Sequence, residues 1–185
     1  QTCALPIWRM VKMNKKIIGV VACSAVAASM AIGASASDEL IKVGYAQVGH
    51  ESDWRTANTQ NYQDVFSEEN GYELSFVDCD NDNAAQIEAV RNFINQELDY
   101  IVIAPIQSAG WDTVLQEAQD AGIPVIIADR EIEASEDLYD AWVGTNTTNE
   151  GITAGNWLAE NLDGKEANIL VIEGSVGASA ALGRS

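Results

Sequence analysis

Short apolar segments alternate with longer segments of helical period from residue 41 onward. Six segments have the length and composition of β-strands: 41–46, 72–77, 100–104, 124–128, 141–144 and 167–172. The third and fourth are continuous apolar runs, which is typical of strands that are buried on both faces of a parallel sheet. Strands that alternate with helices predict an α/β fold, namely a doubly wound parallel sheet with helices on both faces.

The predicted helices carry start signals. Ser52 is a good N-cap for a helix that runs to about residue 70, with one face made of Trp54, Ala57, Val65 and Phe66. Asn83 is predicted to cap the next helix, with Gln86 three residues further on as its capping-box partner. Thr147 and Glu150 have the same spacing and predict the start of a later helix.

The first 36 residues have the pattern of an export signal. Residues 1–12 show no structural pattern and are not expected to be native. Met13 is followed by two lysines, an apolar run and Ala34-Ser35-Ala36, which together predict a signal peptide over 13–36 that is cleaved after Ala36. A transmembrane anchor is the weaker interpretation, because the run lacks bulky residues. A lipoprotein-like sequence before Cys23 offers an alternative, in which the extracytoplasmic protein is anchored by lipid at Cys23.

Charge and residue usage exclude several classes of function. Cleavage after Ala36 leaves six basic against 28 acidic residues, a net charge of −22. Such a surface repels phosphate backbones, so no nucleic-acid partner is expected. One cysteine, Cys79, and one histidine, His50, remain after cleavage. They offer neither an internal disulfide nor a zinc cluster, so no metal and no cofactor are expected.

Polar side chains follow several of the predicted strands, where α/β sheets bind their ligands. Glu51 and Arg55 follow the first strand, and Asp129 and Arg130 follow the fourth. Carboxylates and guanidinium groups together suit a sugar, because each hydroxyl both donates and accepts hydrogen bonds. Trp54 and Trp111 could stack on the apolar face of a sugar ring.

Each of these residues also has an ordinary structural interpretation. Glu51 and Arg55 could be a surface pair one helical turn apart, and Asp129 and Arg130 a solvated turn. The two tryptophans could pack helices onto the sheet. The glycines between 174 and 183 match neither common phosphate-binding motif, so a phosphate site is not expected there.

Several strings resemble the ribose/galactose type of sugar-binding protein that serves ABC importers, and especially its galactofuranose-binding branch. The matching strings are 43–55, 103–106, 110–111, 124–125, 129–130 and 174–179. The resemblance implies a type I periplasmic-binding-protein fold, in which two lobes clamp a monosaccharide. It also implies a monomer that docks on an ABC transporter permease, and no enzymatic activity.

Carried over by motif, the sugar contacts are Glu51, Arg55, Asp129, Arg130 and Arg184. Two departures from the family pattern, Gly183 in place of an aspartate and His50 in place of a smaller residue, could alter the sugar. The resemblance assigns 37–140 to the first lobe and 141–185 to the start of a second lobe, which is expected to be truncated.

Three alternatives share parts of this pattern. A repressor with the same core would need a DNA-binding segment where the signal peptide lies. A glycosidase using Glu51 and Asp129 would need one protonated carboxyl, whereas an arginine lies close to each in sequence. A sugar-sensing receptor for signalling or chemotaxis stays open, because its binding domain would have the same sequence features.

Overall fold

The computed structural model describes residues 39–185, so the predicted upstream segment and signal peptide lie outside the described residues. The strands are β1 (Ile41–Gln47), β2 (Tyr72–Asp78), β3 (Tyr100–Ile103), β4 (Val125–Asp129) and β5 (Ala141–Gly144). The helices are α1 (Asp53–Val65), α2 (Asn83–Asn95), α3 (Asp112–Asp120), α4 (Thr147–Leu162) and α5 (Ser179–Arg184). Two short 3-10 helices, η1 (Glu68–Asn70) and η2 (Glu136–Leu138), complete the elements.

The strands form one parallel sheet in the order β2-β1-β3-β4-β5. The α/β fold with a parallel sheet is therefore confirmed. The chain first adds β2 to one side of β1 and then continues with β3 on the other side. This reversal of direction is the point of an open α/β sheet where ligands bind, beyond the carboxyl ends of the strands.

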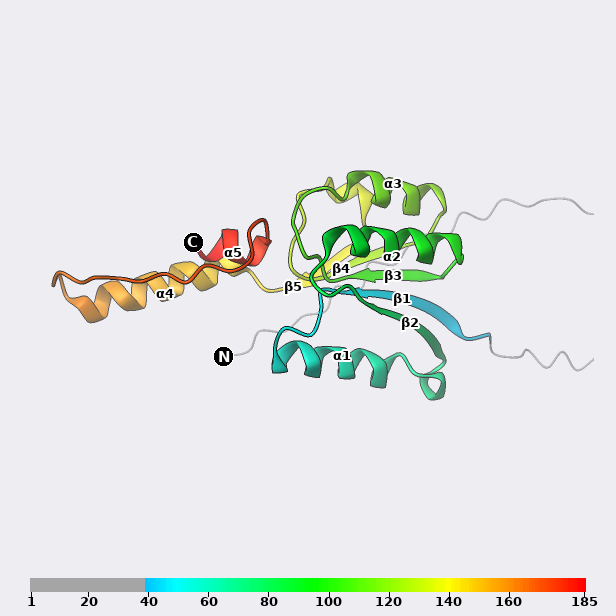
Figure 1. Ribbon diagram of the computed structural model, residues 1–185, viewed down its shortest axis with the longest axis horizontal. Helices are drawn as coiled ribbons and strands as arrows, with labels where there is room; N and C mark the ends of the chain where they lie inside the picture. Colours follow the sequence, from blue (N-terminus) through cyan, green and yellow to red (C-terminus); the bar gives the residue numbers. More distant parts are fainter. Residues whose placement is uncertain (1–38) are drawn as a thin grey trace, which may run out of the picture. The chain divides into compact units, whose positions relative to one another are not determined.

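Helices cover both faces of the sheet, as Figure 1 shows for α1 on one face and α2 and α3 on the other. Adjacent residues of β1 contact helices on opposite faces of the sheet, because successive side chains of a strand point to opposite faces. Tyr45 stacks on Tyr62 of α1 with ring centroids 4.1 Å apart. Next to it, Gly44 lies so close to Phe93 of α2 that an added Cβ would come within 2.6 Å of the ring.

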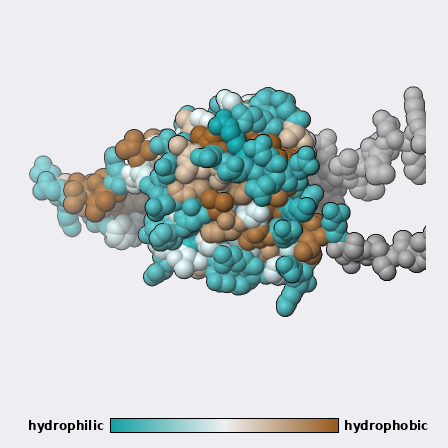
Figure 2. Space-filling model, turned by 45° about the vertical axis from the view of Figure 1, so that its right-hand side comes forward, coloured by the Kyte–Doolittle hydropathy of each residue, from teal (hydrophilic) through white to brown (hydrophobic). Residues whose placement is uncertain are grey.

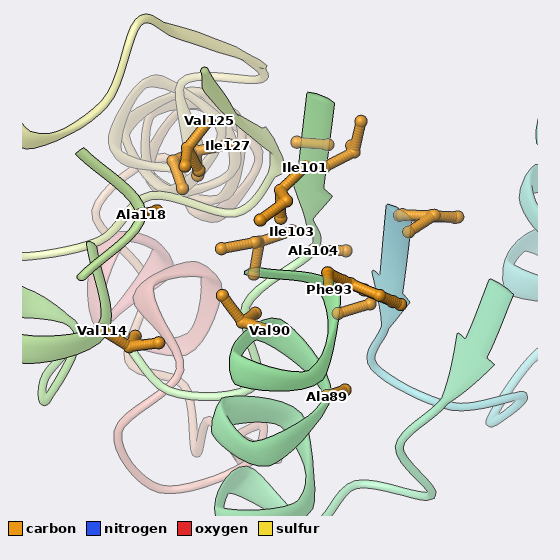
Figure 3. Packing of buried hydrophobic residues seen from close by; sticks show 14 of the residues in the cluster. Ala89, Val90, Phe93, Ile101, Ile103, Ala104, Val114, Ala118, Val125 and Ile127 are labelled. Carbon is orange, nitrogen blue, oxygen red and sulfur yellow. The ribbon is translucent and has the colours of Figure 1, made fainter. Parts of the chain in front are cut away.

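The core on the α2 and α3 face consists mainly of closely packed aliphatic residues, with the aromatic Phe93 among them (Figure 3). Ile101 and Ile103 of β3 and Ile127 of β4 are fully buried, and Val90 and Val114 come from the two helices. Burial of this kind is the main favourable contribution to folding. It holds the carboxyl ends of the strands in fixed relative positions.

The inner face of α1 differs from the sequence prediction. Trp54, Ala57 and Val65 are exposed, whereas Arg55 is buried and Tyr62 packs on the sheet. Polar and aromatic residues, rather than an aliphatic stripe, therefore join this helix to the sheet. The helix also ends at Val65, and the predicted extension to residue 70 is the separate 3-10 helix η1.

Two predicted helix caps are each one residue too late. Asp82, not Asn83, caps α2, and its side chain accepts hydrogen bonds from the amides of Ala84 and Ala85 at 2.8 and 3.1 Å. Asn146, not Thr147, caps α4 through the amide of Asn149. At α4 the preceding asparagine is the better N-cap than threonine, whereas at α2 aspartate and asparagine are equally good caps and residue type alone does not decide.

The C-terminal part departs most from expectation. The predicted strand over 167–172 is not formed, and Leu170 and Ile172 are 87% and 89% exposed. A strand needs a neighbour for its backbone hydrogen bonds, and no strand lies beside this segment among residues 39–185. Ala141–Gly144, assigned to the second lobe from sequence, pairs with β4 in the sheet of the first.

Candidate functional site

The site begins with a buried arginine on α1. Ser52 caps this helix, accepting a hydrogen bond from the Arg55 amide at 3.1 Å, and so places Arg55 in the first turn. The Arg55 side chain is only 3% exposed. Its Nε donates to Glu51 Oε1 at 3.2 Å, and its Nη2 donates to Asp129 Oδ2 at 2.8 Å. One guanidinium group thus joins the loop after β1 to the end of β4, a link that the sequence, which suggested only the pairs Glu51 with Arg55 and Asp129 with Arg130, did not predict.

The electrostatics of this group follow from its burial and its partners. Burial on its own lowers the pKa of Arg55, but the hydrogen bond and charge of Asp129, together with Glu51, raise the pKa overall. The guanidinium is therefore a fixed positive charge between two carboxylates. Its Nη1 is buried and has no hydrogen-bond partner among the described residues, which is uncommon for a buried donor.

Asp129 has an unusual backbone. Its φ angle is +66°, in the left-handed region that residues other than glycine seldom adopt. The neighbouring strand accommodates this geometry, because Gly144 lies opposite Asp129 and a Cβ at Gly144 would overlap the Asp129 carbonyl oxygen. Backbone strain of this kind is concentrated at functional sites. It turns the last residue of β4 toward Arg55.

Arg130 lies beside the same carboxylates with longer contacts. Its Nη2 is 3.7 Å from Glu51 Oε1, and its Nη1 is 3.5 Å from the carbonyl oxygens of both Pro105 and Ile106. Burial and the nearby charge of Arg55 lower the pKa of Arg130. The structure therefore brings together Glu51, Arg55, Asp129 and Arg130, with Arg130 held less tightly than Arg55.

The two tryptophans predicted as sugar platforms have different environments. Trp54 is 57% exposed, and its ring centroid lies 4.8 Å from Cζ of Arg55. It thus presents an exposed aromatic face beside the site. Trp111 is 1% exposed within the core, and its indole N–H donates to the Gln107 carbonyl at 2.8 Å. Trp111 therefore follows the packing interpretation and is not part of the exposed site.

Arg184 lies in α5 and makes no hydrogen bond or ion pair with the four central residues. It pairs with Glu150 of α4 at 2.7 Å. Arg130 and Arg184 nevertheless line the same cavity of about 330 Å³. The remaining lining residues come from the C-terminal segment: 171–175, 178, 180, 181 and 185.

Sequence reasoning missed two polar residues close to the site. Ser108 is 4% exposed, and its amide donates to the Gly177 carbonyl at 2.8 Å, which joins the loop after β3 to the C-terminal segment. Gln86, predicted as a capping-box residue, is instead fully buried and bonded to the ends of β1 and β3. Helical spacing could have predicted that Gln86 is buried, because it places Gln86 on the same face as Ala89, Val90 and Phe93.

The described part of the chain, residues 39–185, has no cluster of His, Cys, Asp and Glu that could hold a metal ion. Over the same residues no helix is long and apolar enough to cross a membrane. The arrangement offers instead fixed donors and acceptors for a polar, uncharged ligand and an exposed indole beside them.

Comparison with known proteins gives consistent matches. Residues 43–185 match the family model described as periplasmic binding protein domain. The galactofuranose-binding protein YtfQ of Escherichia coli (strain K12) is 40% identical over 173 residues, which are 93% of this chain and 52% of that protein. The chain thus spans about half the length of the curated relatives it matches.

Solved structures agree. The crystal structure of a galactofuranose binding protein has a TM-score of 0.73 and 41% identity, covering 78% of this chain and 49% of that one. The binding protein of the arabinose ABC transporter from Shewanella sp. ANA-3, bound to α- and β-L-arabinofuranose, has a TM-score of 0.71 and 40% identity. That match covers 77% of this chain and 47% of the other.

Proposed function

Because this chain belongs to the family of periplasmic binding protein domains, we propose that the full-length protein captures a monosaccharide outside the cytoplasm and delivers it to an ABC importer. The observation that carries the proposal is the Arg55 cluster. A sugar hydroxyl can donate to the partly exposed carboxylate of Asp129 or Glu51, which Arg55 holds in place, and accept from the guanidinium of Arg130. The protein binds this sugar without converting it, and the relatives it matches are binding proteins.

We further propose that the sugar is bound as a furanose. One of the similar structures is a galactofuranose binding protein, and another is bound to α- and β-L-arabinofuranose. The contacts are expected from Glu51, Arg55, Asp129 and Arg130, with Trp54 beside the ring. Arg184 is expected to contribute from the second lobe, since it lines the same cavity as Arg130.

A binding screen on the full-length protein tests this proposal. Galactose, arabinose, ribose and fructose are titrated by calorimetry, and the best ligand is then labelled with ¹³C at the anomeric carbon. The expected result is micromolar or tighter binding, with the bound signal at a furanose chemical shift. A bound pyranose signal would contradict the ring form, and absence of binding by every sugar would contradict the function.

Export and docking are part of the same proposal. We expect cleavage after Ala36, release as a monomer, and docking on an ABC transporter permease. Mass spectrometry of the exported protein should find Ser37 as the first residue. A lipid-modified Cys23 would replace the soluble form with an anchored one, and a signalling kinase in place of a permease as partner would favour the sensing role.

A further inference from the structure

Gln86 is a buried polar side chain whose hydrogen bonds all go to backbone groups. It lies in the first turn of α2 and is 0% exposed. Its Nε2 donates to the carbonyl oxygens of Ala46 at 3.1 Å and Ala104 at 2.7 Å. Its Oε1 accepts from the amide of Ile106 at 2.9 Å. The side chain thus joins α2 to the strand ends that border the candidate site.

These bonds lie where the sheet ladder stops. The register of β1 with β3 ends at Ala46 and Ile103, and one further bond to the Ala46 carbonyl, at 3.1 Å, comes from the amide of Ala104. The carbonyl of Ala104 and the amide of Ile106 have no strand to pair with, and both residues are buried. Gln86 supplies the missing partners, and a buried backbone group without a partner is costly.

Only an amide side chain can make this set of contacts. It needs two donors and one acceptor at the end of a flexible stem of this length, which is the inventory of glutamine. Ionised glutamate keeps the acceptor but loses both donors. Methionine has a similar length and shape and loses all three contacts.

The segment that Gln86 holds is the one that faces Arg130. Pro105 has no amide hydrogen to anchor it. On either side of it, the Ala104 carbonyl and the Ile106 amide bond to Gln86, and the Ala104 amide bonds to the Ala46 carbonyl. Arg130 Nη1 lies 3.5 Å from the carbonyl oxygens of Pro105 and Ile106. At this limiting distance, a small shift of the backbone decides whether the contacts exist.

We propose that Gln86 is a positioning residue of the binding site, which holds Ala104–Ile106 so that the Pro105 and Ile106 carbonyls orient the guanidinium of Arg130. The inference rests on the proposed function for its effect on sugar affinity, but its structural part concerns the ligand-free protein. A residue that merely stabilises the core would alter the stability of the protein and leave Arg130 and the affinity of the folded protein unchanged.

The first test needs no ligand. In the full-length protein, the guanidinium ¹⁵N–¹H signals of Arg130 should shift in Gln86→Met. Those of Arg91, which lies on the same helix and pairs with Glu117 on the surface, should stay in place. Gln96→Met is the matched control, because Gln96 is exposed at the other end of α2 and bonds only within that turn. Unchanged Arg130 signals in folded Gln86→Met would overturn the inference.

The second test measures sugar affinity by calorimetry, using the best ligand of the screen. Gln86→Met should weaken binding about tenfold, the equivalent of one good hydrogen bond, while Gln96→Met leaves it unchanged. In an Arg130→Lys background, the same substitution should change affinity less than about twofold, because it acts through a contact already lost. Effects that simply add in the double variant would contradict the proposed route through Arg130.

The variants have a safeguard against misfolding. If Gln86→Met does not fold, Gln86→Asn replaces it in both measurements, because its shorter stem withdraws the amide from the three backbone groups without burying a charge. A wild-type protein that binds no sugar would contradict the proposed function alone, and the Arg130 signals would still decide the role of Gln86.

Discussion

Residues 39–144 and residues 145–185 differ in how they bury their apolar side chains. The first region contains the whole aliphatic core, with β1, β3 and β4 covered by helices. In the second region, Ala178 is the single buried residue, and the large apolar residues are exposed: Ile152, Trp157, Ile169, Leu170, Val171, Ile172, Val176 and Leu182. Figure 2 shows this apolar surface toward the left of the view.

The difference means that the first region is stabilised by its own core, whereas the second region buries little apolar surface. In the first region, the sheet and helices bury each other, and the Arg55 cluster stands on that framework. In the second region, α4 and α5 contact each other and carry an exposed pair, Arg184 with Glu150. Exposed pairs of this kind contribute little to stability. The proposed ligand-binding groups of the first region are therefore the better preorganised.

The largest expected difference comes from matched leucine substitutions. Leu115 is 0% exposed and Leu182 is 58% exposed. In the present chain, Leu115→Ala should lower the free energy of unfolding by about 2–5 kcal/mol, because it leaves a cavity in the core. Leu182→Ala should change it by less than about 0.5 kcal/mol. Urea denaturation followed by circular dichroism measures both, and equal effects would remove the distinction between the regions.

Two glycine-to-alanine substitutions, one in each region, should change the stability of the protein in opposite directions. Gly44→Ala would put a Cβ within 2.6 Å of the Phe93 ring, and such overpacking costs about 1–3 kcal/mol. Gly155 lies inside α4 with nothing within 4 Å of an added Cβ. Gly155→Ala should therefore stabilise that helix, by up to about 1 kcal/mol. Thermal unfolding of the two variants provides the measurement, and a stabilising Gly44→Ala would show that the first region is loosely packed.

The smallest expected change in stability comes from the pair of His50 with Asp78, at the border of the site. The Nδ1 of His50 lies 2.8 Å from Asp78 Oδ2, and this bond, with the charges of Asp78, Asp80 and Glu51, raises the pKa of His50 above its ordinary 6.5. The stabilisation is fully present below pH 6.5 and is lost as the pH rises through the raised pKa.

His50 is the only histidine of the chain, so its NMR titration is unambiguous. Asp78→Asn should lower the pKa of His50, with little change in unfolding free energy because the pair is exposed. Asp64→Asn, on the outer surface of α1, is the control and should leave the His50 titration unchanged. A pKa that does not respond to Asp78→Asn would show that the pair does not persist in solution.

Much of the first region could be predicted because its signals are local. Continuous apolar runs marked β3 and β4, and the rule that parallel strands end at one edge placed Arg55 and Asp129 at the same edge before any contact was known. The positive φ of Asp129 left no trace in the sequence, because an aspartate tolerates that conformation without requiring it.

The errors have physical causes as well. The inner face of α1 was missed because Arg55 and Tyr62 replace the aliphatic residues that a hydrophobic pattern detects. The segment 167–172 has the composition of a strand, but a strand forms only beside a partner, which composition does not supply. Trp111 could be either a ligand contact or a core residue from sequence, and only the packing of α3 decides.

The central claim is that the charged cluster around Arg55 binds a sugar, and Asp129→Ala tests it most directly in the full-length protein. Removing one charged partner from such a network costs about 2–5 kcal/mol, so affinity should fall about 30-fold to several thousand-fold. Because alanine is strained at the φ of +66°, Asp129→Asn, which tolerates it, should show an intermediate loss. Asp120→Ala, on the outer surface of α3, is the control. Calorimetry should find the largest loss of affinity in Asp129→Ala, a smaller loss in Asp129→Asn and none in Asp120→Ala. Wild-type affinity in folded Asp129→Ala would instead place the sugar elsewhere.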